Sequence, residues 1–126
     1  MIKTEQEYKR SLSEIVQMKK SINKNPPLEN LGVGAFNLGI QDEVKEYENI
    51  KAGKIPNYLY SFDNIGLLLI ALRIESGLSQ SELARKLGVP ASQVCRDERN
   101  DYHGVSTITI NKLLKIYNKK LTIKAI

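Results

Sequence analysis

The chain has 126 residues, of which 41% are hydrophobic, and its formal net charge at pH 7 is +5. Its longest apolar run, residues 65–72, is far shorter than the ~20 residues of a membrane-spanning helix, so we expect no membrane segment. A single cysteine and a single histidine exclude a disulfide framework and a multi-cysteine zinc site, and we expect neither a metal nor another cofactor.

The N-terminal part is predicted to form two helices. The first residues contain no apolar signal region, which predicts a cytoplasmic protein. Thr4 is a good N-cap, and two glutamates in the following turn suit the positive end of a helix dipole, so a helix is expected from about Thr4 to Asn23. From Leu28 on, apolar residues recur mostly three or four apart, which predicts a second helix that ends at Gly53, either continuous or broken near its glycines.

Both N-terminal helices have an apolar stripe that needs a partner, because a helix whose apolar face stays in water gains no packing to offset its ordering entropy. Three partners are considered: the rest of the same chain, a second protomer, or another protein. The residues of the stripes are Tyr8, Leu12, Ile15, Ile22, Phe36, Ile40, Val44 and Tyr47.

The positive charge is confined to the C-terminal part. Residues 1–72 contain nine Lys/Arg and nine Asp/Glu, whereas residues 73–126 contain ten Lys/Arg and five Asp/Glu. The whole net charge therefore lies in the last 54 residues. Charge localised in this way is typical of a surface that binds phosphates.

Four helices are expected in this basic part. The first covers about residues 63–76 and is apolar on nearly all sides. Gly77 is expected to end it as a left-handed C-terminal cap. Ser79 and Glu82 form a capping box at the start of the second, which stops at Gly88.

The third of these helices begins at residue 90 or 91, ends at Arg99 and has few bulky apolar residues, so something other than the core must use its surface. Ser106 caps the fourth helix. The tail LTIKAI, residues 121–126, alternates like a short strand that is suited to pairing across a dimer.

The stretch GLSQSELARKLGVPASQVCRDER, residues 77–99, resembles the helix-turn-helix of the Xre family, the phage repressor and Cro-like DNA-binding proteins. The resemblance covers about residues 65–117. The stretches KTEQEYKRSLSEI and DEVKEYENIKAG also resemble the helical extension of some Xre regulators and of HigA-type antitoxins. The positions that fit the helix-turn-helix pattern are Gly77, Leu78, Ser79, Gln80, Glu82, Leu83, Ala84, Leu87, Gly88, Val89, Gln93, Val94 and Glu98.

This resemblance implies an all-α fold: a five-helix lambda-repressor-like helix-turn-helix domain preceded by an N-terminal helical hairpin. The expected division places the helical extension at residues 1–53, a linker at 54–63, the DNA-binding domain at 64–120 and a tail at 121–126.

In this family the second helix of the motif lies in the DNA major groove, where short side chains allow close approach and polar ones read base edges. The resemblance implies that Ala91, Ser92 and Arg96 face the bases. Arg96 is the strongest candidate, because a guanidinium can bond O6 and N7 of guanine together. Gln93 and Cys95 flank these positions.

Phosphate contacts are implied at the preceding helix. Gln80, in its first turn, matches a position that contacts the DNA backbone in the family, assisted by the helix N-terminus. For the basic residues of the module, phosphate contact and a solvated face are equally good interpretations. They are Arg85, Lys86, Arg99 and Lys112.

Other residues of the motif are interpreted as structural. In phage repressors the residues that match Arg73 and Glu98 form a partly buried salt bridge, so the resemblance implies the same pair here. Cys95 is interpreted as a small neutral filler rather than a redox sensor. Asp97 departs from the family, which has a large apolar residue there; either the helix sits differently, or Asp97 bonds to the following loop or the last helix, with Tyr102 as one partner.

The sequence favours two functions and argues against a third. The first is a sequence-specific transcriptional regulator, a repressor that binds double-stranded operator DNA as a homodimer. The second is an antitoxin whose N-terminal helices neutralise a toxin while the basic part represses their operon. The third, an enzyme, has no support, because the sequence offers no nucleophile with a histidine base, no phosphate-binding glycine loop and no metal cluster.

Overall fold

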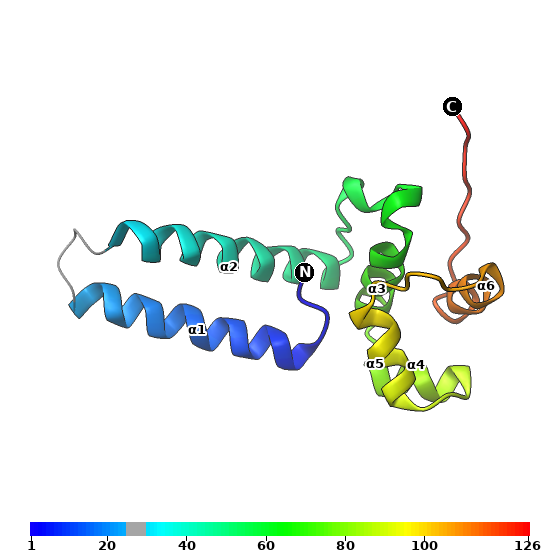
Figure 1. Ribbon diagram of the computed structural model, residues 1–126, viewed down its shortest axis with the longest axis horizontal. Coiled ribbons are helices and arrows are strands. Elements are labelled where there is room, and N and C mark those ends of the chain that lie inside the picture. The colour runs from blue at the N-terminus through cyan, green and yellow to red at the C-terminus, as the bar shows by residue number, and fades with distance from the viewer. Residues whose placement is uncertain (25–29) are drawn as a thin grey trace.

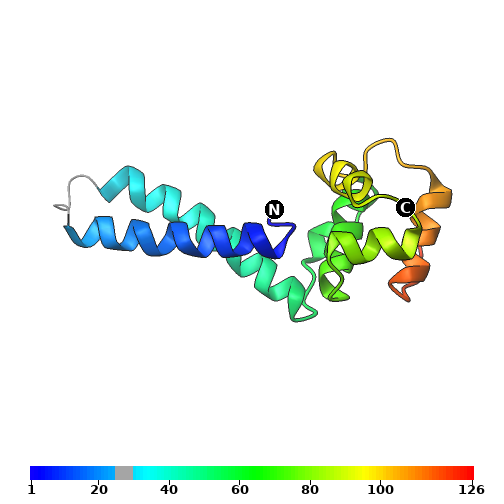
Figure 2. The same cartoon turned by 90° about the horizontal axis from the view of Figure 1, so that it is seen from below.

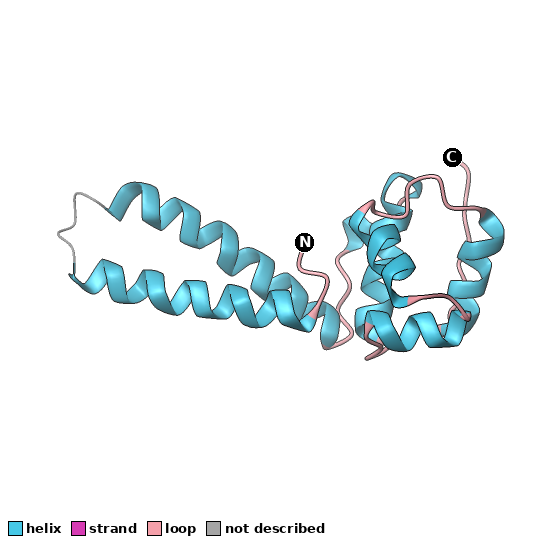
Figure 3. Ribbon diagram, turned by 60° about the horizontal axis from the view of Figure 1, so that its bottom comes forward, coloured by secondary structure: helices cyan, strands magenta, loops and turns pink. Residues whose placement is uncertain are grey.

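The chain folds into a long helical hairpin joined to a small helical bundle (Figure 1). A computed structural model describes residues 1–24 and 30–126, and the side chains outside residues 21–38. No strand occurs in the described residues, so the predicted all-α fold is confirmed (Figure 3). The helices are α1 (Glu5–Lys24), α2 (Asn30–Lys51), α3 (Ile65–Glu75), α4 (Gln80–Leu87), α5 (Ala91–Arg99) and α6 (Thr107–Ile116), with two 3-10 turns, η2 (Asn57–Leu59) and η3 (Phe62–Asn64), before α3.

The hairpin consists of α1 and α2, which run antiparallel (Figure 1). Thr4 caps α1 as predicted, because its hydroxyl accepts a hydrogen bond from the Glu7 amide at 3.1 Å. In the second helix the glycines cause no break: α2 is continuous from Asn30 to Lys51, and Gly53 follows in a left-handed conformation with φ +89°. Leu28, from which the second helix was expected, lies outside the described residues.

The two apolar stripes of the hairpin pack mainly against each other. Ile15, Val44 and Tyr47 are buried. The rings of Tyr8 and Tyr47 stack with their centroids 4.8 Å apart. Leu12 remains 37% exposed, whereas Ile22 and Phe36 lie outside the residues whose side chains are described.

The base of the hairpin is packed into the bundle, so part of its apolar surface is covered by the same chain. Ile2, Tyr47 and Ile50 belong to the same buried cluster as the residues of α3. Leu59, in the segment expected to be a linker, is fully buried in that cluster too. The hairpin is therefore packed against the bundle at its base, and the rest of it projects away from the bundle (Figure 2).

The bundle is built around α3, whose Leu68, Leu69 and Ile70 are buried almost completely. The other helices each contribute a short apolar stripe, because α4, α5 and α6 are only eight to ten residues long. Their most buried residues are Leu83, Ala84, Val94 and Leu113.

The bundle differs from one expectation. The resemblance implies five helices in the helix-turn-helix domain, whereas residues 65–126, all of them described, contain four α-helices, the number expected from the residues themselves. After Tyr117 the chain adopts a left-handed conformation at Asn118 (φ +55°), and too few residues remain for another stable helix. The tail 121–126 forms no strand within the described chain. A strand needs a neighbouring strand for its hydrogen bonds, so the expected pairing of the tail across a dimer stays a prediction.

The capping box of α4 gives a first prediction. Ser79 Oγ accepts from the Glu82 amide at 3.1 Å, and the Glu82 carboxylate accepts from the Ser79 amide at 3.2 Å. Replacing Ser79 by alanine should lower the free energy of unfolding by about 1 kcal/mol, as measured by urea denaturation.

Hydrogen bonds from Ser79 to the Glu82 carboxylate, chiefly the one from the Ser79 backbone amide, lower the pKa of Glu82. A lowered pKa in the folded state adds stability above the unfolded-state pKa, and this stability is lost as the pH falls through the folded-state pKa. Glu82→Gln removes the titration, so its stability should fall less than that of the wild type between pH 7 and about pH 3. Equal falls would contradict the capping box.

Candidate nucleic-acid interface

Two short helices, α4 and α5, meet at a tight turn that fixes their crossing. Gly88 closes α4 in a left-handed conformation with φ +73°, and the Val89 amide donates to the Ala84 carbonyl at 3.0 Å. Ala84 is buried at the contact, where a larger side chain would hold the helices apart. Pro90 then starts α5.

The helix α5 has one buried face and one polar face. Val94 and Glu98, one turn apart, point into the core and are 1% and 0% exposed. Ser92, Arg96 and Arg99 follow a spacing of four and three, so they share a stripe of the exposed face. The paucity of bulky apolar residues noted in the sequence is thus explained: only one side of α5 packs.

The predicted base-reading residues lie together on this polar face. Ala91, Gln93 and Arg96 are exposed, like Ser92, and Cys95 is half-buried beside them. The Arg99 guanidinium lies 3.5 Å from the Cys95 sulfur. Arg99, to which the sequence assigned two equal interpretations, therefore shares the surface of Arg96.

Two more cations lie at the end of α4. Arg85 and Lys86 occupy its last turn, and both side chains are exposed. Together with Arg96 and Arg99 they give the α4–α5 pair four cations. Of the three acidic residues of this pair, Glu98 is turned into the core, Asp97 is half-buried and Glu82 is exposed in the first turn of α4. Cations therefore outnumber the acidic residues outside the core, which suits contact with phosphates.

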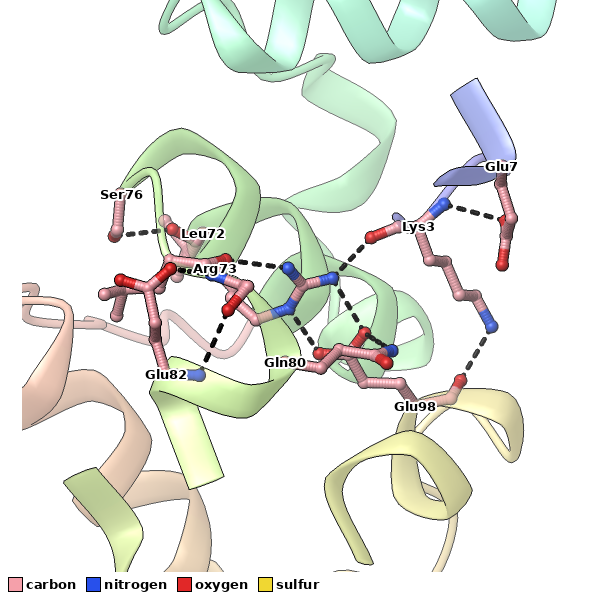
Figure 4. A network of polar contacts seen from close by, with 10 residues as sticks. Lys3, Glu7, Leu72, Arg73, Ser76, Gln80, Glu82 and Glu98 are labelled. Carbon is pink, nitrogen blue, oxygen red and sulfur yellow. Dashed lines mark hydrogen bonds and ion pairs between the residues drawn. The ribbon is translucent and has the colours of Figure 1, made fainter. Parts of the chain in front are cut away.

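A buried ion pair holds α5 against α3. Arg73 Nε donates to Glu98 Oε2 at 2.6 Å and its Nη2 donates to Glu98 Oε1 at 2.9 Å, with side chains 4% and 0% exposed (Figure 4). Arg73 also donates to the carbonyl oxygens of Leu78 and Lys3. The guanidinium thus uses nearly all its donors, which is what a buried cation requires. The structure brings together the two residues that the sequence pairs.

Gln80 belongs to this network rather than to the exposed surface. Its side-chain Nε2 donates to Glu98 Oε1 at 2.9 Å, and the residue is half-buried (Figure 4). The amide group suggested for phosphate contact is therefore engaged with Glu98, and it ties the first turn of α4 to α5.

Asp97 makes its contact through the backbone. Its carbonyl accepts from the Tyr102 amide at 2.8 Å, closing the end of α5. The suggested side-chain pairing does not form: the Tyr102 hydroxyl is buried with no hydrogen-bond partner among the described residues. Its ring packs into the core, and this burial raises the pKa of the Tyr102 phenol.

Sequence reasoning missed Lys3. Its Nζ donates to the Glu98 carbonyl and to Asp101 Oδ1, each at 2.7 Å (Figure 4 shows the first of these contacts). Nothing in the local sequence around residue 3 indicates a contact with a residue more than ninety positions away.

The crossing of α4 and α5 and the polar outer face of α5 are the geometry of one known motif. Residues 69–124 match the family model described as helix-turn-helix. This segment has the helix-turn-helix fold. It begins within α3 and ends in the tail, so the four helices α3–α6 all contribute to it. No curated protein and no solved structure matches the chain.

In residues 1–24 and 30–126, no three His, Cys, Asp or Glu side chains are grouped as a metal ion would need. Within the same ranges, no helix combines the length and apolar character needed to span a bilayer.

Proposed function

We propose that this protein is a sequence-specific transcriptional regulator, a repressor that binds operator DNA as a homodimer with α5 in the major groove. The observation that carries the proposal is the two-sided character of α5. Its inner face is locked by Val94 and Glu98, while Ser92, Arg96 and Arg99 project from the other face of the helix-turn-helix. Selection from a pool of random duplexes tests it, and enrichment of no sequence would contradict it.

Arg96 is the proposed base-reading residue. Arg96→Ala should weaken binding to the selected operator by about 1–3 kcal/mol and relax the preference at one base pair, because a bidentate contact to guanine is lost. Mobility-shift titrations against single-base variants of the operator measure both effects.

Arg85→Ala is the matched control for Arg96→Ala. Arg85 is an exposed arginine of the same domain that we assign to phosphate, so its loss should weaken all duplexes equally. If the two variants lose affinity with the same pattern across sequences, Arg96 does not read a base.

We further propose that the homodimer forms through an apolar surface of the bundle, defined by Phe62, Ile65, Ile110, Leu121 and Ile123. A hollow of about 540 Å³ lies among them, and Phe62 is 74% exposed beside it. A surface that combines a protruding ring with a hollow can complement a copy of itself across a two-fold axis.

Phe62→Asp should therefore convert the dimer to monomer and weaken operator binding, because a charge would be buried in the apolar interface. Light scattering and a DNA titration at equal protein concentration measure the two effects. Tyr58→Asp is the control, since Tyr58 is also exposed but does not line the hollow. A dimer that survives Phe62→Asp would exclude this interface.

The antitoxin remains a second candidate, favoured by one observation on the hairpin. Leu12 and Val16 of α1 are 37% and 52% exposed and line a shallow hollow with Ser13, Gln17 and Lys20. Such a patch on a projecting helix suits a protein partner. The experiment is co-expression with the product of the adjacent gene: a growth defect relieved by this chain, but not by a variant with Leu12→Asp and Val16→Asp, would support the antitoxin.

A further inference from the structure

The first four residues lie against the end of the helix proposed to read DNA. We call Met1–Thr4 the N-terminal strap. Ile2 is buried in the common core, and the Lys3 carbonyl accepts a hydrogen bond from Arg73. The Lys3 ammonium donates to the Glu98 carbonyl in the last turn of α5 and to the Asp101 carboxylate just beyond it, each at 2.7 Å. The strap thus joins the hairpin to α5 directly (Figure 4).

The turn on which Lys3 acts is conformationally strained. Asp101 and Tyr102 both have left-handed backbones, with φ +52° and +55°, although neither is glycine. Such backbone conformations persist only where contacts with the surrounding structure enforce them. Two contacts enforce them here. Lys3 pairs with the Asp101 side chain, and the Asp101 carbonyl lies so close to α3 that a Cβ added at Gly66 would be 1.8 Å from it.

The contacts of α5 are concentrated at its C-terminal end. Glu98 alone is held by three elements: Arg73 of α3 and Gln80 of α4 bond its carboxylate, and Lys3 of the strap bonds its carbonyl. A cation at this end also compensates the negative end of the helix dipole. Of the proposed base-facing residues, Ala91 and Ser92 lie at the opposite, N-terminal end of α5, which is held by the turn after α4, the burial of Val94 and packing on α4, whereas Arg96 lies in the last turn, two positions before Glu98. A tilt of α5 at Glu98 therefore moves Arg96 with its turn and displaces Ala91 and Ser92 at the far end.

We infer that Lys3 is a positioning residue for DNA recognition: by clamping the C-terminal end of α5 it sets the orientation in which α5 enters the groove. This inference rests on the proposed function. It implies that Lys3 matters for specific binding, which requires α5 in register with the bases, and not for non-specific binding, which requires only charge near phosphates.

The test uses the full chain with Lys3→Met, which keeps an unbranched apolar side chain of similar length and removes the ammonium. Lys9→Met is the matched control, because it removes the same charge from an exposed position of α1. We expect Lys3→Met to bind the selected operator about tenfold more weakly and a scrambled duplex within about twofold of the wild type at the same salt concentration. Lys9→Met should leave the ratio of the two affinities unchanged, and Lys3→Arg, which restores a donor cation, should recover most of the specific affinity.

Amide hydrogen exchange gives a readout that does not depend on DNA. The Tyr102 amide donates to the Asp97 carbonyl, so it reports on the turn that Lys3 clamps, and its exchange should be about tenfold faster in Lys3→Met. Thermal unfolding monitored by circular dichroism ensures that each variant is folded at the temperature of the titrations. If Lys3→Met unfolds there, the titrations of Lys3→Arg decide. The inference requires Lys3→Arg to keep most of the affinity for the operator, and an equal loss of affinity for the operator and the scrambled duplex would overturn it.

Three outcomes would overturn the inference: equal operator affinities of Lys3→Met and Lys9→Met, a parallel loss of specific and non-specific binding, or unchanged exchange at Tyr102. If the wild-type chain selects no sequence at all, the proposed function is what fails. The role of Lys3 in DNA recognition then fails with it, and the exchange measurement still decides whether Lys3 fixes the end of α5.

Discussion

Replacing Arg73 by methionine should lower the free energy of unfolding by about 3–5 kcal/mol, the largest effect expected of a single substitution discussed for this chain. The change leaves the Glu98 carboxylate in the core, 0% exposed, with no cation beside it. Only the Gln80 amide would still donate to the carboxylate, which is too little for a buried charge. Urea denaturation followed by circular dichroism measures the loss.

The double variant Arg73→Met, Glu98→Leu separates a buried charge from lost packing. If the cost of the single change comes from the uncompensated carboxylate, removing that carboxylate should restore most of the stability. Lys51→Met is the control for an exposed ion pair: Lys51 and Glu5 are 52% and 49% exposed, so breaking their 2.8 Å contact should cost at most about 1 kcal/mol. A loss of that size for Arg73→Met would contradict the importance given to the buried pair.

Binding to the selected operator should fall by about 10³-fold or more between about 50 and 200 mM salt, if ~6 phosphates are neutralised, because counterions released from DNA drive the association. The source of the charge is the basic part of the chain, and Arg85, Lys86, Arg96 and Arg99 are its members on α4 and α5. Fluorescence anisotropy with a labelled duplex across the salt series measures the slope.

Arg85→Ala provides an internal check of this slope, which should become shallower by about one, as expected for the loss of one phosphate contact. Affinity that does not change with salt would exclude the proposed surface. It would do so even if the chain bound DNA, because the positive residues of α4 and α5 could not then be the contacts.

The helix-turn-helix was predictable because its signals are local. A capping box at Ser79 and Glu82, a left-handed glycine at position 88 and small residues at the crossing each act within a few positions of the chain. Each of these features is dictated by backbone hydrogen bonding or by contact sterics, so each leaves a recognisable residue at a fixed spacing.

Features that depend on distant parts of the chain were not predictable. The left-handed conformations at Asp101 and Tyr102 have no glycine to announce them, because they are imposed by packing on Gly66 and by the Lys3 contact. The strand expected in the tail also depends on a distant partner: alternation over six residues describes a strand only when a second strand is present to pair with it, so its pairing across a dimer stays a prediction. The contact of Gln80 was not predictable for the same reason. Its position in α4 does not indicate that the Glu98 carboxylate of α5 lies within hydrogen-bond distance.

The N-terminal strap has a consequence for how the chain acquires its structure during synthesis. Its contacts join residues separated by 95 and 98 positions, so Lys3 finds its acceptors only after Asp101 has emerged from the ribosome. The helices can form before that point from contacts of short sequence separation, whereas closing so large a loop adds a substantial entropic cost at a later stage. The helix α5 therefore gains this anchor only after residue 101 has been synthesised, and a nascent chain that has not reached it cannot hold α5 in its final orientation.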